Sequence, residues 1–286
     1  DSYITKSKHN VAHHYDLSDK LYELFLDPDR QYSCAYFNSP NDTLEQAQIN
    51  KKELISKKLL LEEGQSVLDI GCGWGGMAAH VYKKSNANVV GVTLSEEQIA
   101  YAKQRKINEK LDKVEYRLQD YRNVNETYDR IVSVGMFEHV GTSHYQEFFN
   151  KVHDLLNDTG VALIHTIGRL TEPTNNDPWI EKYIFPGGYI PALSETMSRV
   201  EKSGLSLTDV QVLRFHYAET LKRWRYNFYD NIDKVKELYD EKFCRMWDFY
   251  LSSSQASFEE AGLVVFQLQL SKNKKTVPDS RNYMLT

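Results

Sequence analysis

The chain has 286 residues, 41% hydrophobic and 12% aromatic, which is enough to bury one large α/β core. Its formal net charge of −5 gives no overall basic field, so a nucleic-acid partner is not expected. Cys34, Cys72 and Cys244 show no repeating spacing, which favours free thiols in a reducing cytoplasm over a disulfide framework.

Residues 1–62 are predicted to form a helical N-terminal cap. The segment DLSDKLYELFLD places leucines and a phenylalanine on one stripe, and Thr43 is a suitable N-cap for the segment TLEQAQINKKELISKKLLL. The chain begins with Asp1 rather than methionine, which is consistent with a further N-terminal domain upstream.

From about residue 66 onward, β-rich runs alternate with helical patterns. Strands are predicted at SVLDI (66–70), NVVGVT (88–93), VEYRLQ (114–119), YDRIVSV (128–134) and GVALIHTI (160–167), with helices over 77–84, 95–110 and 144–156. This alternation predicts βαβ units around a parallel sheet. Residues 63–167 would be the cofactor-binding core.

The second half of the chain departs from this alternation. Residues 168–192 are rich in proline, glycine and aromatics, which indicates a lid or substrate-pocket insertion. Residues 168–258 would form a lid and acyl-pocket region that includes a sixth strand and a helical, aromatic segment over 217–258. Residues 259–286 would hold the last strand, LVVFQLQLSK, and a polar, mobile tail.

A glycine-rich turn follows the first predicted strand. Gly71, Gly73 and Gly76 match GxGxxG, but residues 91–93 lack the acid that a dinucleotide site would place there. Asp69, two residues before Gly71, suits a cationic cofactor better than a pyrophosphate, which it would repel. A tight turn without a ligand is the plainer alternative.

The DxGxG pattern resembles the first motif of class I S-adenosylmethionine-dependent methyltransferases. GVTLSEEQ resembles their second motif, and QDYR at 119–122 occupies the usual adenine-side position. The resemblance implies S-adenosylmethionine as cofactor. The contacts it implies come from Tyr32, Ser33, the turn 68–76 with Asp69, Gly71, Gly73, Trp74 and Gly75, residues 93–98 with Thr93, Leu94 and Gln98, and the pair Tyr121 and Arg122.

Five segments together narrow the family. HYDLSDKLYELFLDPDRQYSCAYF, LDIGCGWGG, GVTLSEEQ, FEHVG and HYAETLKRW resemble the cyclopropane fatty acid synthases, including the mycolic acid cyclopropane synthases, from about His9 to Lys272. The resemblance implies an α/β fold: a seven-stranded, mostly parallel, Rossmann-like methyltransferase sheet with helices on both faces, a helical N-terminal preface and helical lid insertions.

The family resemblance also implies a reaction. S-adenosylmethionine donates a methyl to a cis double bond of an acyl chain, and the carbocation loses a proton to a bound bicarbonate as the ring closes. The matching positions are the Cys34 N–H, Glu138, His165, the Ile167 backbone and Tyr217, with Tyr15 near the cation.

These residues make physical sense as one site. Side chains two residues apart on a strand point to the same face, so His165 and Ile167 share one face. Ligands of α/β sheets bind at the carboxyl edge of the sheet. We expect Glu138 to face the reaction centre, and the Glu138 and Tyr217 side chains to be hydrogen-bonded. His139 is expected to be structural.

Two departures from the family pattern bear on mechanism. Tyr121 and Arg122 stand where many relatives have Trp and Glu, which leaves the adenine contact open. Ser254 replaces a cysteine of many relatives, so a covalent thiol mechanism at that position is impossible. The thiol of Cys34 is not needed.

Two other clusters have plainer interpretations. His9 and His13 lack a partner at a known metal spacing, so no metal site is expected. The lysine pairs at 51–52, 57–58, 83–84 and 274–275 are expected to be surface charges, which would dock on anionic phospholipid only if they shared a face.

Two rivals to acyl cyclopropanation remain open. One is a methyltransferase of the same fold that methylates a lipid or small molecule without ring closure, as in the related plant alkaloid N-methyltransferases. The other is a catalytically silent cofactor-binding protein. The expected partner is an unsaturated acyl phospholipid at the membrane surface, so the protein would be cytoplasmic and peripherally membrane-associated. A homodimer is compatible with the sequence.

Overall fold

The apolar runs predicted as strands form a single sheet. The computed structural model describes residues 17–175, 178 and 188–285, and within these the strand order is β3-β2-β1-β4-β5-β7-β6. β7 is antiparallel to β5 and β6, and the other neighbours are parallel, as predicted. The strands are β1 (Ser66–Ile70), β2 (Asn88–Thr93), β3 (Val114–Leu118), β4 (Tyr128–Val134), β5 (Leu156–Arg169), β6 (Ser206–Leu213) and β7 (Leu263–Ser271).

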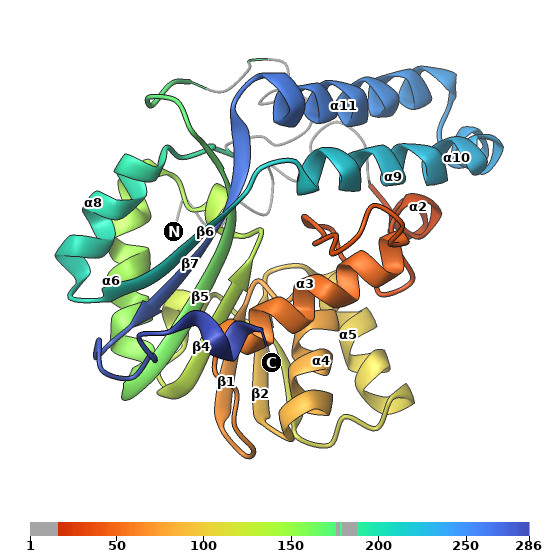
Figure 1. The fold of residues 1–286 in the computed structure, drawn as a ribbon. Coiled ribbons are helices and arrows are strands. Elements are labelled where there is room, and N and C mark those ends of the chain that lie inside the picture. Colours follow the sequence, from red (N-terminus) through yellow and green to blue (C-terminus); the bar gives the residue numbers. More distant parts are fainter. Residues whose placement is uncertain (1–16, 176–177, 179–187, 286) are drawn as a thin grey trace.

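Helices cover both faces of the sheet (Figure 1), because its central strands carry apolar side chains on both sides. One face packs against α3 (Leu44–Lys58), α4 (Gly76–Ser85) and α5 (Glu96–Asn108), and the other against α6 (Tyr145–Leu155) and α8 (Leu193–Ser203). The predicted N-cap of α3 is confirmed, since Thr43 Oγ1 accepts from the Gln46 N–H at 3.1 Å.

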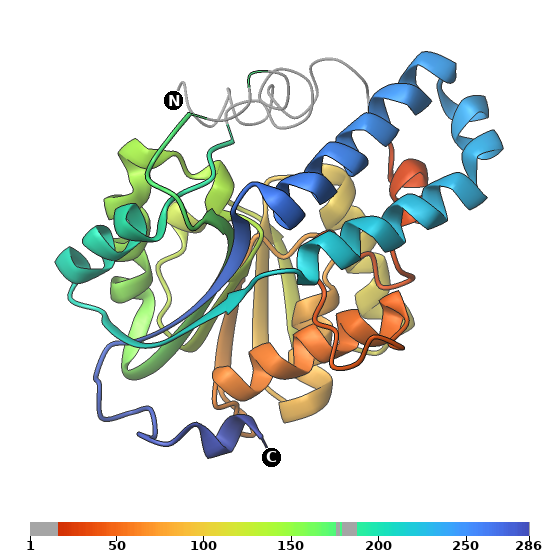
Figure 2. The same ribbon diagram turned by 45° about the horizontal axis from the view of Figure 1, so that its top comes forward.

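An arm of helices rises from the carboxyl edge of the sheet (Figure 2). It consists of α9 (His216–Asp230), α10 (Ile232–Leu238) and α11 (Glu241–Glu260), and α2 (Asp19–Phe25) packs against it. The Phe25 ring lies 5.9 Å from that of Trp224 and 5.6 Å from that of Trp247, both edge-on. These aromatics form a second core, which holds the N-terminal cap and the arm together.

The 168–192 segment is described in part. β5 extends to Arg169, so the strand takes up the first two residues of the predicted insertion. Residues 188–192 return beside its end, where the Arg169 N–H donates to Pro191 O at 3.0 Å and the Tyr189 N–H to Glu138 O at 2.9 Å. Trp179, Tyr183 and Phe185 lie outside the described residues, as do Tyr15, His9 and His13.

The C-terminal tail is packed, and the expectation of a mobile tail was wrong. Val277 is buried, Gln269 Nε2 donates to Tyr283 Oη at 2.8 Å, and Arg281 pairs with Asp209. The tail therefore covers the end of the sheet near β6 and β7 rather than extending into solvent.

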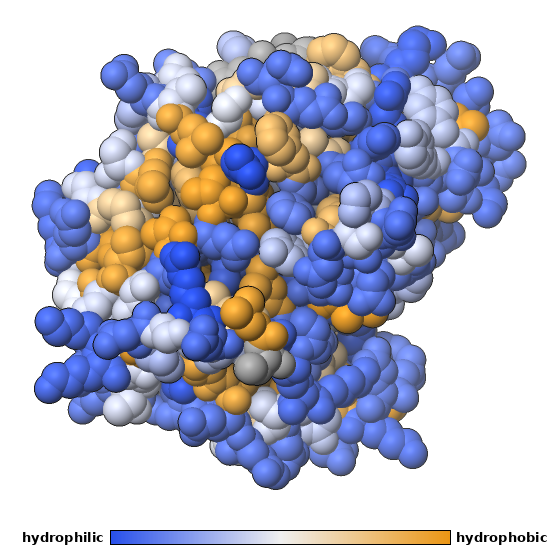
Figure 3. All heavy atoms as spheres, viewed as in Figure 1, coloured by the Kyte–Doolittle hydropathy of each residue, from blue (hydrophilic) through white to orange (hydrophobic). Residues whose placement is uncertain are grey.

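The surface combines polar helices with apolar areas. In Figure 3, apolar residues gather at the left and centre of the view, over the region of β6, β7 and α8, whereas polar residues cover most of the α9–α11 side. Among the described residues, none of the helices has the length and apolar character that crossing a membrane requires.

Candidate active site

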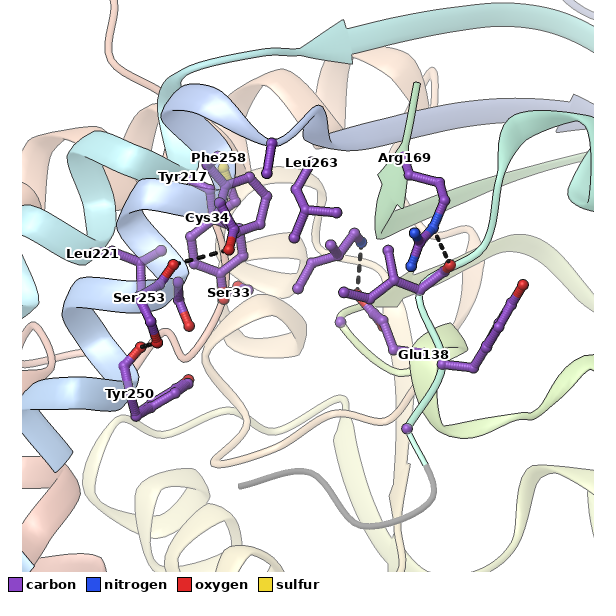
Figure 4. Close-up of a pocket in the computed structure, with 18 of the residues that line it drawn as sticks. Ser33, Cys34, Glu138, Arg169, Tyr217, Leu221, Tyr250, Ser253, Phe258 and Leu263 are labelled. Atoms are coloured by element: carbon purple, nitrogen blue, oxygen red, sulfur yellow. Dashed lines mark hydrogen bonds between the residues drawn. The ribbon is translucent and has the colours of Figure 1, made fainter. Parts of the chain in front are cut away.

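A cavity of about 700 Å³ opens at the carboxyl edge of the sheet, below the arm. Its walls come from the loop after α2, the ends of β4 and β5, and helices α9 and α11. In Figure 4, Tyr217 and Phe258 lie on one side of the cavity, and Glu138 and Arg169 on the other. The lining includes Tyr32, Ser33, Cys34, Gly135, Glu138, His139, His165, Ile167, Arg169, Tyr189, Tyr217, Phe249, Tyr250, Ser253, Ser254, Ser257, Phe258 and Leu263.

The glycine-rich turn joins β1 to α4 in a conformation that requires glycine. Gly71 has φ +80° and Gly75 φ +89°, a region that other residues avoid. A Cβ on Gly71 would lie 2.9 Å from the side chain of Met136, and one on Gly75 would lie 2.6 Å from the Tyr116 ring. The turn thus lies against the segment that carries Glu138. Gly73 also has a positive φ, and Trp74 Nε1 donates to Asp19 Oδ1 at 3.1 Å.

Asp69 is buried at the end of β1, and its Oδ2 has no hydrogen-bond partner among the described residues. Burial raises the pKa of Asp69 to about 7, against the opposing effects of Lys51 and the Ala78 N–H. An acidic oxygen that lacks a partner in the interior is costly, so a cationic or hydrogen-donating ligand beside it would stabilise its ionised form.

Lys51 positions the loop that carries Ser33 and Cys34. Its ammonium donates to Ser33 Oγ at 2.7 Å and to Gln31 Oε1 at 2.8 Å. It is fully buried, and burial lowers its pKa to about 7. The prediction that the first two lysine pairs are surface charges was therefore wrong for Lys51, and also for Lys52 and Lys58, which are buried too. Lys83 and Lys84 are exposed, as predicted.

Glu138 lies in a short 3₁₀ turn after β4, and its carboxylate lines the cavity. Oε1 accepts from the Ile167 N–H at 2.6 Å, while Oε2 is buried without a partner among the described residues. Burial raises the pKa of Glu138, opposed by that hydrogen bond. The N–H of Ile167, whose backbone is predicted to contact the bicarbonate, therefore orients Glu138.

His165 and Ile167 both line the cavity from β5, as their spacing predicts. His165 Nδ1 lies 3.1 Å from Gln267 Nε2, whereas its Nε2 is buried without a partner among the described residues. Burial and the nearby cations Lys51 and Lys58 lower the pKa of His165 well below its usual value. The imidazole is consequently neutral, with one N–H to offer.

Tyr217 lies in the first turn of α9 and forms part of an aromatic wall of the cavity. Its ring stacks on Phe258 at 4.7 Å and meets Trp224 edge-on at 5.7 Å. Burial raises the pKa of Tyr217, with smaller contributions from Tyr250, Cys34 and Glu138, so the hydroxyl stays protonated and can donate. His139, expected to be structural, is exposed and lines the cavity.

The thiol of Cys34 at the cavity is a poor nucleophile. Cys34 Sγ donates to the Ala35 carbonyl at 3.3 Å, and burial raises the pKa of the Cys34 thiol, which keeps it protonated and unreactive. Ser254 lines the cavity in α11. That the reaction uses no thiol nucleophile stays a prediction.

The second cofactor motif forms the turn from β2 to α5. Thr93 Oγ1 donates to Gln98 Oε1 at 3.1 Å and accepts from the Ser95 N–H at 3.2 Å, with Leu94 half-buried between them. Farther along the edge, Arg122 pairs with Asp120 at 2.6 Å, and the Tyr121 ring meets Phe148 edge-on at 5.6 Å.

Sequence reasoning missed Lys51, Lys58 and Gln267. The signal for Gln267 was the pair of glutamines inside the mainly apolar strand LVVFQLQLS, because a polar side chain in a fully covered strand needs a buried partner. The lysines gave no such signal, since α3 is rich in charge.

Known proteins with similar sequences and folds indicate the family of this chain. Residues 3–268 match the family described as mycolic acid cyclopropane synthetase. The chain is 41% identical over 259 residues to the cyclopropane-fatty-acyl-phospholipid synthase of Escherichia coli (strain K12), an alignment that covers 91% of this chain and 66% of that protein.

Two solved structures share the fold over nearly their whole length. The cyclopropane synthase MmaA2 from Mycobacterium tuberculosis superposes with a TM-score of 0.86 and 36% identity, covering 92% of this chain and 97% of that one. The mycolic acid cyclopropane synthase CmaA1 complexed with SAH and CTAB gives 0.85 and 36%, covering 91% and 96%. The chain belongs to the mycolic acid cyclopropane synthetase family of S-adenosylmethionine-dependent methyltransferases, as its motifs predicted.

Proposed function

We propose that the protein transfers a methylene equivalent from S-adenosylmethionine to a cis double bond of an unsaturated acyl chain, most simply of membrane phospholipid, and closes a cyclopropane ring. The observation that carries this proposal is the arrangement of Glu138 Oε2 and His165 Nε2, two buried atoms without described partners, at one largely apolar cavity. When bound, S-adenosylmethionine supplies an electrophilic methyl group, and bicarbonate supplies the base that removes a proton from the resulting carbocation.

The residues at the edge of the sheet fit a cationic nucleoside cofactor. The positive-φ glycines leave the backbone of the turn open to close approach, and the partnerless Asp69 Oδ2 favours positive charge nearby. Tyr32, Ser33 and the Thr93–Gln98 pair would contact the cofactor from the neighbouring loops. The SAH complex of CmaA1 supports this assignment.

The cavity residues also fit bicarbonate. The ion has oxygens that accept hydrogen bonds and one hydroxyl that donates, so it needs both kinds of partner. The Cys34 N–H, His165 and the Tyr217 hydroxyl would donate to it, and Glu138 Oε2 would accept from its hydroxyl. That last contact turns an expected repulsion between two anions into a hydrogen bond. Ile167 acts through Glu138, whose carboxylate it orients.

The walls suit a carbocation intermediate. Aromatic faces stabilise a cation without attacking it, and Tyr217, Phe258 and Tyr250 all line the cavity. A largely apolar lining also keeps water from quenching the cation. Phe249 lines the cavity while remaining 52% exposed, which would give an acyl chain an apolar entry from the membrane surface.

The proposal is tested by depleting bicarbonate. Turnover on vesicles of a cis-monounsaturated phospholipid, measured in buffer purged of carbon dioxide, should fall by about tenfold or more, and added bicarbonate should restore it. Glu138→Gln should show a similar loss that bicarbonate does not restore, with cofactor affinity nearly unchanged. Full turnover in depleted buffer would show that bicarbonate is not the base.

A further inference from the structure

A chain of buried polar side chains crosses the sheet from His165 to helix α3. His165 on β5 faces Gln267 on β7, which faces Gln211 on β6, in direct cross-strand register. Lys58, the last residue of α3, donates its ammonium to Gln267 Oε1 at 2.6 Å and also to Gln211 Oε1. His165, Gln267 and Lys58 are each at most 2% exposed.

The lysine determines which way the Gln267 amide points. An ammonium has only donors, so the atom facing Lys58 has to be the amide oxygen. The amide NH₂ then faces His165, whose Nδ1 lies 3.1 Å away. Burial lowers the pKa of Lys58 to about 8, with Asp209 acting in the opposite direction, so the ammonium form predominates at neutral pH.

The orientation of the amide in turn selects the histidine tautomer. A neutral imidazole has one N–H and one acceptor nitrogen, and the hydrogen bond at one nitrogen decides the state of the other. Because Gln267 donates to Nδ1, the proton of His165 resides on Nε2. That nitrogen is the buried atom without a described partner at the cavity.

We propose that Lys58 and Gln267 are positioning residues that hold His165 in its Nε2–H tautomer, so that it presents a hydrogen-bond donor to the anion in the cavity. This inference rests on the proposed function for its consequence, but the tautomer itself is independent of it. Lys58 contacts no carboxylate within ion-pair distance among the described residues, and burying such a charge is expensive. The need to orient the Gln267 amide explains why Lys58 is buried despite this cost.

The sharpest variant is Gln267→Glu. The new carboxylate has nearly the same shape and can still accept from Lys58, so folding should be preserved. Its second oxygen, however, accepts instead of donating, which moves the His165 proton to Nδ1 and leaves Nε2 as an acceptor facing the anion. Turnover should fall by about tenfold or more with cofactor affinity unchanged. Lys58→Met removes the group that orients the Gln267 amide, so His165 should populate both tautomers.

The direct readout is nitrogen NMR of protein labelled with ¹⁵N-histidine, which distinguishes protonated from unprotonated ring nitrogens. The His165 signals are assigned by their loss in His165→Gln. Gln269→Leu is the control, because Gln269 is an equally buried glutamine two residues along β7 whose amide donates to the Lys58 carbonyl and to Tyr283 rather than to His165. This variant therefore disturbs the end of α3 but keeps the contact between Gln267 and His165. We expect Nε2–H in the wild type and the control, Nδ1–H in Gln267→Glu, and a mixture in Lys58→Met.

The outcomes separate this inference from the proposed function. A proton on Nδ1 in the wild type, or an unchanged tautomer in Gln267→Glu, would overturn the positioning role whatever bicarbonate does. If Gln267→Glu inverts the His165 tautomer but wild-type turnover does not depend on bicarbonate, the positioning role stands and bicarbonate is rejected as the base.

Discussion

Cofactor affinity should depend on pH through Asp69. Burial raises the pKa of this carboxyl to about 7, whereas a bound cationic cofactor favours the ionised form. Below pH 7 the protein must lose a proton before binding, so the dissociation constant rises as the pH falls. A pKa of about 7 gives a loss of roughly 30-fold between about pH 8 and pH 5.5, or about 2 kcal/mol.

Isothermal titration calorimetry with S-adenosylmethionine measures this effect directly. Titrations in two buffers of different ionisation enthalpy count the released protons, and near pH 7 we expect about half a proton per cofactor. Asp69→Asn is the control, since it should bind more weakly at high pH and lose the pH dependence. Constant affinity with no proton release would refute the assignment of Asp69 to the cofactor site.

Three further substitutions test other parts of the structure. Lys51→Met should weaken cofactor binding by about tenfold in the same calorimetric assay, because the loop with Ser33 loses a buried hydrogen bond; unchanged affinity would reject that positioning role. Ser254→Ala should leave turnover nearly unchanged, and an inactive variant would make α11 a catalytic element. Phe25→Ala should lower the free energy of unfolding in urea by about 3–5 kcal/mol, because it leaves a cavity between Trp224 and Trp247; a loss below about 1 kcal/mol would show that the aromatic core does not depend on it.

The sequence predicted those parts of the site that depend on short-range patterns along the chain. The central strands of the parallel core contain short apolar runs. The glycine turn directly follows β1, and Glu138 comes four residues after the end of β4. Because the carboxyl ends of parallel strands meet at one edge, their convergence follows once the sheet is predicted. The same reasoning placed His165 and Ile167 on one wall.

The parts that sequence did not predict depend on contacts between distant segments. Gln267 reaches His165 only because β7 inserts antiparallel beside β5, 102 residues away. Lys51 and Lys58 look like surface charges on a helix with little amphipathic character, and their burial depends on the α2 loop and on β6 and β7. The tail is held by Arg281, whose partner Asp209 lies 72 residues away in sequence, and by Tyr283, which accepts a hydrogen bond from Gln269.

The proposed reaction is tested most directly by mass spectrometry of lipids after the protein acts on vesicles of a cis-monounsaturated phospholipid with S-adenosylmethionine. We expect each modified chain to gain one CH₂, about 14 mass units, and to lose its double bond, because ring closure consumes the alkene while other fates of the cation leave an alkene or a hydroxyl. A methylated product that keeps its double bond, or no lipid product from protein that binds the cofactor, would contradict acyl cyclopropanation.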